Sequence, residues 1–315
     1  MLMNEQSSGR ETPQRPRPST RRIVVIGANG ALGSDLVKVF RAGWQVTGLT
    51  PDDLDVRELE SVRRPLLAAR PDVVINTAAY NLVREAETNV DEAHAVNAAG
   101  AGHVAAVARE IGAVCLHYGT DYVFDGETTR PYTENDRPRP LNVYGKSKLA
   151  GERAVLEASP RNLVLRTTGL YGETPTVTKG RNFVQIIWQM ARGRLEISIS
   201  EREVCSPTWT LELARQTRAV IEAGASGLFH TVNEGVCTWR EFAQAVLDLS
   251  GERVVVRGQP QAPDPGLARP RYTALENARL RALGLSLMRP WRVALEEFLR
   301  SEGGARLRTL TSVDA

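Results

Sequence analysis

The sequence predicts an α/β protein built on a doubly wound parallel sheet, with a smaller, interleaved lobe towards the C-terminus. Three features of the 315-residue chain support this prediction. Apolar runs rich in β-branched residues alternate with segments of helical periodicity, the first run is followed by a glycine-rich turn, and the alternation loosens after the fifth run. This order is typical of a parallel sheet with helices on both faces.

The individual elements follow from the apolar pattern. Short runs that we expect to form buried strands lie at residues 23–26, 44–49, 73–76, 113–118 and 162–166. Helical spacing is expected at residues 36–40, 57–69, 85–110 and 144–158. Shorter helices are expected near residues 183–192, 210–222 and 239–250, among stretches where proline and glycine cluster.

The domain organisation follows the same change of pattern. Residues 21–170 are expected to form the main domain, with elements near 205–235 returning to it, and residues 171–305 to form most of a second lobe. Residues 1–20 are polar, proline-rich and aperiodic, which predicts a disordered tail, with a basic binding arm as the alternative. Residues 306–315 are expected to be a second tail.

The composition excludes several classes of protein. The formal charge is +3 and arginines are interspersed with acids, so no basic stripe for nucleic acid is expected. No apolar run approaches the roughly 18 residues that span a bilayer, and the N-terminus lacks an apolar leader. The three cysteines are far apart and no His/Cys spacing indicates a metal site. We therefore expect a cytoplasmic protein with no nucleic-acid, membrane or metal partner.

A glycine-rich turn follows the first expected strand directly and precedes a helix. Its sequence, GANGALG, has glycine at every third position, which is the spacing of short-chain dehydrogenases. Glycines allow backbone N–H groups to approach a pyrophosphate at the helix N-terminus, as in a Rossmann dinucleotide-binding domain. A tight turn without a ligand is the alternative. The cofactor contacts expected here are Gly27, Asn29, Gly30, Ala31, Leu32 and Gly33.

The end of the second expected strand bears on the choice of cofactor. An acid there would bind the ribose 2′-hydroxyl and repel a 2′-phosphate, but Leu49 and Thr50 are not acidic. Asp55 and Val56 come a few residues later, and we expect them beside the adenine. The sequence therefore predicts NADPH as the cofactor, with NADH as the alternative.

Tyr144 and Lys148 are four residues apart on an expected helix and would share one face. A free tyrosine titrates near pH 10, and a nearby ammonium lowers that pKa and can also bind the cofactor ribose. Thr120 lies just past the fourth expected strand, at the edge of the sheet where ligands bind. Together these side chains can bind and protonate a carbonyl oxygen. A chance pair on an exposed helix is the alternative.

Several longer motifs resemble one known family, the dTDP-4-dehydrorhamnose reductases. The motifs are GTDYVFDG (119–126), PLNVYGKSKLAGE (140–152), RTTGLYG (166–172), CSPTW (205–209) and ARPRYTAL (268–275). Members are extended short-chain dehydrogenases that reduce the C4 keto group of nucleotide-linked 6-deoxysugars. The resemblance implies hydride transfer from the nicotinamide to C4, a proton from Tyr144, a ribose contact and pKa tuning by Lys148, and a hydrogen bond from Thr120 to the carbonyl.

The resemblance also implies further contacts, a pathway and an assembly. On the cofactor side it points to Thr77, Ala78, Ala79 and Asn97. On the side of the nucleotide-linked keto-sugar it points to Asp121, Tyr122, Gly169, Asn182, Phe183, Glu203 and Arg271, with Arg269 as the alternative to Arg271. Members of the family dimerise, so a homodimer is expected. The setting is deoxysugar biosynthesis, with antibiotic-type products favoured over the cell envelope.

Departures from the family pattern leave the sugar and its C4 configuration open. Gly169 stands where the family has a tryptophan that flanks the sugar, and Gly119 stands for the usual serine. Asn81 replaces a threonine, and Arg84 and Glu85 reverse two charges of the family. Thr120, Tyr144 and Lys148 are kept, so the hydride chemistry is less affected than the substrate.

Two other functions compete with a reductase. A non-catalytic or regulatory dinucleotide-binding protein is one, because the regulatory subunit of methionine adenosyltransferase resembles the family and keeps the same tyrosine and lysine. An epimerase or dehydratase on the same scaffold is the other. Dehydratases usually place an Asp-Glu pair after the threonine, whereas Thr120 is followed by Asp121 and Tyr122 here.

Overall fold

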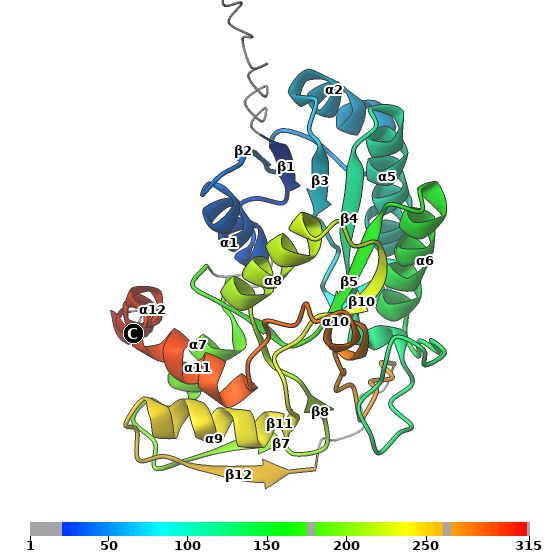
Figure 1. Ribbon diagram of the computed structural model, residues 1–315. Coiled ribbons are helices and arrows are strands. Elements are labelled where there is room, and N and C mark those ends of the chain that lie inside the picture. The colour runs from blue at the N-terminus through cyan, green and yellow to red at the C-terminus, as the bar shows by residue number, and fades with distance from the viewer. Residues whose placement is uncertain (1–20, 175–179, 261–265, 314–315) are drawn as a thin grey trace, which may run out of the picture.

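A six-stranded, fully parallel sheet forms the centre of the molecule (Figure 1), as the sequence predicts. The computed structural model describes residues 21–174, 180–260 and 266–313, so the tail predicted at 1–20 lies outside the described residues. The strand order is β10-β5-β4-β3-β1-β2. The strands are β1 (Arg22–Ile26), β2 (Gln45–Leu49), β3 (Val73–Asn76), β4 (Val114–Thr120), β5 (Leu163–Thr167) and β10 (Gly227–His230).

Alternate residues of the strands enter two apolar cores, one on each face of the sheet. Ile23 and Val25 pack towards helices α1 (Ala31–Phe40) and α8 (Thr210–Glu222). Val24 packs towards the opposite face, which is covered by α2 (Leu59–Ala69), α5 (Ala101–Glu110) and α6 (Val143–Ala158). Burial on both faces explains why the strands appear in the sequence as continuous apolar runs.

The single long helix expected over residues 85–110 is wrong in detail. The chain forms α3 (Val83–Ala86), α4 (Val90–His94), a π-helical turn (Ala95–Gly100) and then α5. The π-helical turn holds Asn97, whose buried amide bonds to the backbone of Tyr80 and to Ser147. Widened turns of this kind are frequent at functional sites, and these polar contacts outweigh the helical periodicity.

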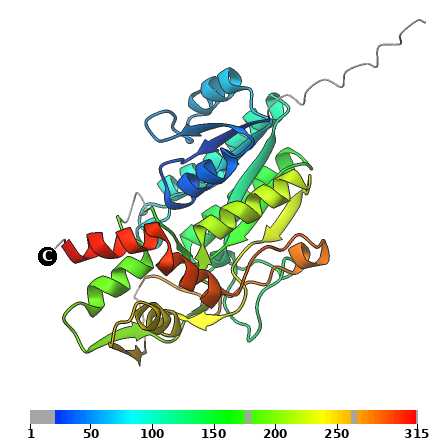
Figure 2. The same ribbon diagram turned by 60° about the vertical axis from the view of Figure 1, so that its left-hand side comes forward.

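The second lobe lies beyond the carboxyl ends of the sheet strands (Figure 2). Its core packs Tyr171, Trp209, Phe242 and Phe298 against one another. The lobe contains three two-stranded sheets. They pair β6 (Leu170–Tyr171) with β9 (Thr208–Trp209), β7 (Glu196–Ser200) with β12 (Val255–Gln259), and β8 (Val204–Cys205) with β11 (Cys237–Thr238). Its helices are α7 (Phe183–Ala191), α9 (Trp239–Leu249), α11 (Trp291–Arg300) and α12 (Glu302–Val313), whereas α10 (Ala278–Ala282) packs against β10 of the main sheet.

The tail expected from residue 306 is instead part of helix α12, which continues to Val313. Leu307 is buried in the core of the lobe and holds this helix in place. The apolar residues near the end of the sequence are too few to show a helical period, so the packing of Leu307 could not be predicted from them. No helix in the described part of the chain is long and apolar enough to cross a membrane.

A buried carboxyl group joins the sheet domain to the start of α8. Asp35 on α1 is 4% exposed and accepts a hydrogen bond from the Thr210 hydroxyl at 2.6 Å. Burial raises the pKa of Asp35 from 3.8 to about 6, and the hydrogen bond from Thr210 only partly opposes this effect. The folded protein therefore holds this proton more tightly than the unfolded chain does. Its stability falls as the pH rises from 3.8 to about 6.

We predict that Asp35→Asn raises the free energy of unfolding above pH 6 by up to about 3 kcal/mol, because it removes the cost of a buried charge. The amide oxygen keeps an acceptor for Thr210. Urea unfolding at several pH values measures the effect, with the exposed Asp52→Asn as the control. Equal pH slopes for Asp35→Asn and the wild type would contradict the prediction.

Candidate active site

Helix α6 presents Tyr144 and Lys148 one turn apart at the carboxyl edge of the sheet. Asn142 begins the helix, and its side-chain oxygen accepts a hydrogen bond from the Gly145 N–H at 2.8 Å. Lys148 is 3% exposed, whereas Tyr144 is half-buried. The shared face predicted from the sequence is thus turned towards the sheet and not to solvent.

Thr120 ends β4 and meets Tyr144. The Thr120 hydroxyl donates to Asp121 Oδ1 at 3.0 Å, and it lies near enough to the Tyr144 hydroxyl to influence its pKa. Asp121 is buried and accepts from the Thr168 hydroxyl at 2.7 Å. Burial raises the pKa of Asp121, and the surrounding hydroxyl groups only partly oppose this. Asp121 therefore orients the Thr120 hydroxyl from inside the protein, and both of its carboxylate oxygens accept hydrogen bonds from threonine side chains.

Burial raises the Tyr144 pKa above its ordinary value, which opposes the lowering by Lys148 that the sequence predicts. The neighbouring Thr120 hydroxyl has a smaller effect that lowers this pKa. Burial also lowers the pKa of Lys148 to about 8, opposed by Glu152. The Lys148 Nζ donates to the Tyr118 carbonyl oxygen at 2.6 Å. Tyr144 is therefore a protonated phenol at neutral pH, suited to donate a proton.

A buried ion pair lies directly behind this group. Arg166 and Glu152 are 3% and 2% exposed, and Arg166 Nη2 lies 2.7 Å from Glu152 Oε2. A Cβ at Gly119 would lie 2.2 Å from Glu152 Oε1. The ion pair thus occupies the space of the serine that the family usually has at position 119.

The glycine turn has the geometry of a phosphate cradle. Gly27 has φ +81°, and a Cβ at Gly33 would lie 2.0 Å from the Gly27 oxygen. No side chain caps the first turn of α1, and that turn contains no acid. Its backbone N–H groups and helix dipole therefore suit a diphosphate, so the residues present fit a dinucleotide. Asn29 is exposed and Ala31 half-buried, whereas Leu32 is buried in the core beneath the turn.

Residues after β2 form the adenine side expected from the sequence, with one addition. Asp55 pairs with Arg57 at 2.5 Å, and Val56 is buried. Asp53 Oδ2 accepts from the Thr50 N–H at 2.8 Å and the Thr50 hydroxyl at 2.9 Å. An acid therefore does lie at the end of β2. The spacing along the sequence does not reveal this acid, because the chain turns back between Thr50 and Asp53.

Residues after β3 line the other wall of the turn. Thr77 donates its hydroxyl proton to the Ile26 carbonyl at 2.7 Å, and the Ala78 N–H donates to Asn76 Oδ1 at 3.0 Å. Ala78 and Ala79 are half-buried. Asn97 is fully buried, with its amide bonded to Tyr80 and Ser147. Asn97 therefore shapes the wall through these bonds.

The sugar side of the site gathers around Tyr122. Its ring packs edge-on against Tyr144, with centroids 5.6 Å apart, and its hydroxyl accepts from Arg269 Nη1 at 3.1 Å. Burial raises the pKa of the half-buried Glu203, and the charge of Arg269 has a smaller, opposing effect. Arg271 is exposed, and its backbone oxygen bonds to the Val204 N–H. The structure thus brings Arg269, and not Arg271, to this group.

Asn182, Phe183 and Gly169 have mainly structural surroundings. Asn182 caps α7, accepting from the Gln185 N–H at 3.0 Å and donating to the Gly172 oxygen at 2.7 Å, so both ends of its amide are engaged. Phe183 packs against Trp239 with centroids 4.5 Å apart. Gly169 has φ +60°, and a Cβ there would lie 3.3 Å from the Trp239 ring. Trp239 therefore borders the space left by the family's tryptophan.

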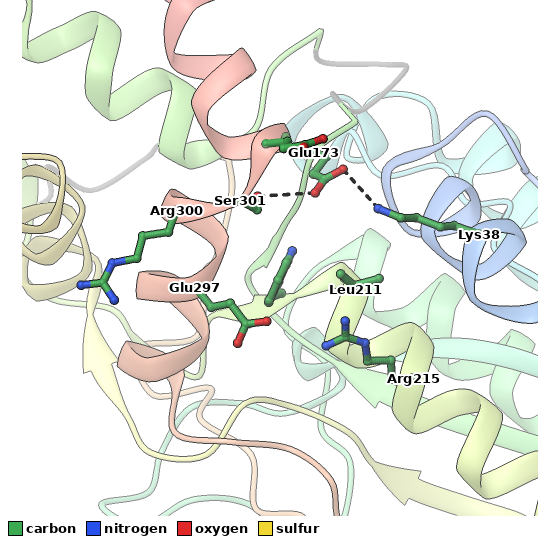
Figure 3. A pocket seen from close by; sticks show the side chains of 10 residues that line it. Lys38, Glu173, Leu211, Arg215, Glu297, Arg300 and Ser301 are labelled. Carbon is green, nitrogen blue, oxygen red and sulfur yellow. Dashed lines mark hydrogen bonds and ion pairs between the residues drawn. The ribbon is translucent and has the colours of Figure 1, made fainter.

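A separate pocket lies between α1, α8, α11 and α12 (Figure 3). Lys38 Nζ lies 3.6 Å from Glu173, and the Ser301 hydroxyl donates to Glu173 Oε1 at 3.5 Å. Arg215, Glu297 and Arg300 complete its charged lining. The pocket contains none of the residues around Tyr144, and its acids and bases offset one another. In the described part of the chain, no cluster of His, Cys, Asp and Glu could hold a metal ion.

Fold and site together define a class, the dinucleotide-binding proteins of the short-chain dehydrogenase type, with a tyrosine and a lysine on one helix. The sequence profile described as RmlD substrate binding domain matches residues 21–303. The chain belongs to this family.

Relatives with named functions align with nearly the whole chain. The dTDP-4-keto-6-deoxy-D-glucose reductase of Streptomyces niveus is 38% identical over 88% of this chain and 96% of its own. A solved dTDP-4-dehydrorhamnose reductase from Clostridium acetobutylicum has a TM-score of 0.84 at 34% identity, covering 89% of this chain and 98% of its own. Another, from Bacillus anthracis in complex with NADP, has a TM-score of 0.83 at 32% identity, covering 90% and 99%. The resemblance seen in the motifs is confirmed.

We predict that Gly33→Ala abolishes dinucleotide binding, because its Cβ would collide with the backbone of Gly27 and push α1 away from the turn. Titration with NADPH, followed by fluorescence, measures the loss. Gly102→Ala in the interior of α5 is the control, since a Cβ there makes only ordinary contact at 3.6 Å. Wild-type affinity in Gly33→Ala would show that the turn does not hold the cofactor.

Proposed function

We infer that this protein catalyses the NAD(P)H-dependent reduction of the C4 keto group of a dTDP-4-keto-6-deoxyhexose, in deoxysugar biosynthesis. The observation that carries the inference is that Thr120, the half-buried Tyr144 and the buried Lys148 lie together at the carboxyl edge of the sheet. The family supports the same reaction, since its named relatives are reductases of such sugars.

The residues around the glycine turn would hold the cofactor. Gly27, Gly30 and Gly33 would let the backbone approach the diphosphate, and Lys148 would contact the ribose of the nicotinamide. When bound, the dihydronicotinamide supplies the hydride. NADPH is the expected cofactor, as in the Bacillus anthracis structure, with NADH also accepted.

The proton is supplied by the protein. When the keto-sugar binds, the Thr120 hydroxyl would turn its proton from Asp121 to the ketone oxygen. The Tyr144 phenol would transfer its own proton to that oxygen as negative charge develops there. The raised pKa of Tyr144 keeps the phenol protonated until that moment. Lys148, whose pKa is about 8, then returns a proton to the phenolate.

The nucleotide end of the substrate is assigned to Arg269, with Tyr122 and Glu203 beside it. Arg269 Nε is buried and has no hydrogen-bond partner among the described residues, while Nη1 is bound to Tyr122. A diphosphate oxygen would satisfy that donor, and a guanidinium suits such an anion. Gly169 and Trp239 would border the sugar, and we expect the substrate range to differ from that of tryptophan-bearing relatives.

Two further parts of the proposal concern setting and assembly. The three cysteines are free and buried thiols, which supports a reducing, cytoplasmic location. We also propose a homodimer, which sedimentation in solution would test. We further propose an antibiotic-type product, because Gly169 replaces the tryptophan of the family.

We predict that Tyr144→Phe lowers kcat for dTDP-4-keto-6-deoxyhexose reduction by about 10²–10⁴-fold, since the phenol is the proton donor. NADPH affinity should stay within a few fold. Initial rates of NADPH oxidation measure the effect, with Tyr132→Phe as the control because the Tyr132 hydroxyl serves only Asp125 and Gly126. An undiminished kcat would remove Tyr144 from the mechanism.

We predict that Asp53→Asn increases the preference for NADPH over NADH by roughly tenfold, about 1.4 kcal/mol, because a carboxylate at the end of β2 repels a 2′-phosphate. The ratio of kcat/KM for the two cofactors is the measurement. The exposed neighbour Asp52→Asn should leave that ratio unchanged. A ratio that is equal in Asp53→Asn and the wild type would place Asp53 outside the ribose site.

A further inference from the structure

A buried histidine that the proposed mechanism does not use lies directly behind Lys148. His117 on β4 is 1% exposed. Its Nε2 lies 3.2 Å from Lys148 Nζ, and its Nδ1 lies 3.3 Å from Asn76 Nδ2. The imidazole therefore bridges the end of β3 and helix α6, with a nitrogen-bearing partner on either side.

The backbone fixes the orientation of the Asn76 amide. The Ala78 N–H lies 3.0 Å from Asn76 Oδ1, and a backbone N–H can only donate, so the oxygen of Asn76 must face Ala78. The NH₂ group of Asn76 then faces His117 Nδ1 and donates to it. Burial holds the pKa of His117 well below its ordinary value, so the ring is neutral. A neutral ring whose Nδ1 accepts carries its proton on Nε2.

This tautomer has a consequence for the lysine. An ammonium has three donors and no acceptor, so it gains nothing from an N–H that points at it. A neutral amine has a lone pair that can accept from His117 Nε2–H at 3.2 Å while the amine donates to the Tyr118 oxygen at 2.6 Å. The geometry satisfies every polar atom only with the neutral form of Lys148.

We propose that Asn76 and His117 are positioning residues that set the proton state of Lys148, by holding the imidazole in the tautomer that bonds to the neutral amine. The proposal rests on the proposed function for its role in turnover, but the tautomer itself is a property of the free protein. Asn76 and His117 touch neither the ketone nor Tyr144 and act through Lys148.

The other groups that face Lys148 leave its proton mobile. Glu152, one turn further along α6, favours the ammonium, but its carboxylate accepts three hydrogen bonds from Arg166. Tyr144, one turn earlier, is a neutral phenol in the free protein. Burial and the His117 tautomer favour the amine, while Glu152 favours the ammonium. The two forms are therefore close in free energy near neutral pH.

During turnover this balance moves one proton. When Tyr144 has given its proton to the ketone oxygen, its phenolate charge favours the ammonium, and a proton from solvent binds Lys148 Nζ. The ammonium then transfers that proton to the phenolate, and the amine returns to its bond with His117 Nε2–H. One solvent proton thus replaces the one that remains in the product hydroxyl.

The direct test is ¹⁵N NMR of the imidazole of His117 in the free, full-length protein, at neutral and at alkaline pH. The expected result is a proton on Nε2 and none on Nδ1. A proton on Nδ1 would overturn the proposal. The measurement needs neither cofactor nor sugar, so its outcome is separate from that of the assay for keto-sugar reduction.

Asn76→Asp reverses the arrangement with almost no change of shape. The carboxylate still accepts from Ala78, but it also accepts from His117 Nδ1–H, so Nε2 becomes an acceptor for the Lys148 ammonium. We expect the Nδ1–H tautomer in the NMR spectrum and an alkaline limb of kcat/KM shifted upwards by about one pH unit. His117→Gln, whose amide oxygen can face Lys148, should shift the limb in the same direction. An unshifted limb in both variants would show that the two residues only fill space.

Discussion

The site depends on how closely helix α6 lies against the sheet and the π-helical turn. A Cβ at Gly145 would lie 2.2 Å from the Tyr122 oxygen, and one at Gly151 would lie 2.0 Å from the Asn97 oxygen. Only glycine permits this approach at either position. The approach buries Lys148 and brings Tyr144 next to Thr120, so the geometry of the polar groups follows from backbone packing.

Burial then decides the protonation states. In a medium of low polarity the neutral form of each group is favoured, so the pKa of Tyr144 rises and that of Lys148 falls. Both shifts serve a reduction, because the phenol must arrive protonated and the lysine must release a proton easily. The buried pair of Glu152 and Arg166 adds rigidity behind the site, and neither charge is left uncompensated.

Much of this could be predicted from the sequence, and the failures have physical causes. The strands were predictable because burial on both faces makes them continuous apolar runs. Tyr144, Lys148 and Thr120 were predictable because helix periodicity and strand ends place them at one edge of the sheet. Their protonation was not predictable, because it depends on burial. Arg269 and Asp53 depend on how loops fold back, and spacing along the chain does not reveal that.

The sequence also does not distinguish amide side chains that bind a ligand from those that bind the protein's own backbone. Asn182 matches the family pattern, yet its amide oxygen caps helix α7 and its amide nitrogen donates to the Gly172 oxygen. Asn97 is likewise engaged on both sides by the chain itself. An amide side chain has the same identity whether it binds a ligand or a backbone, so only the hydrogen-bond partners distinguish the two roles.

The central claim is that a hydride and a proton are added across the C4 carbonyl of a nucleotide-linked keto-sugar. The most direct measurement is NMR of the product formed from a dTDP-4-keto-6-deoxyhexose and NADPH deuterated at the transferring position. The account predicts one deuterium, bonded to C4 of the sugar, in a single configuration. A product without deuterium, or with deuterium at another carbon, would contradict it.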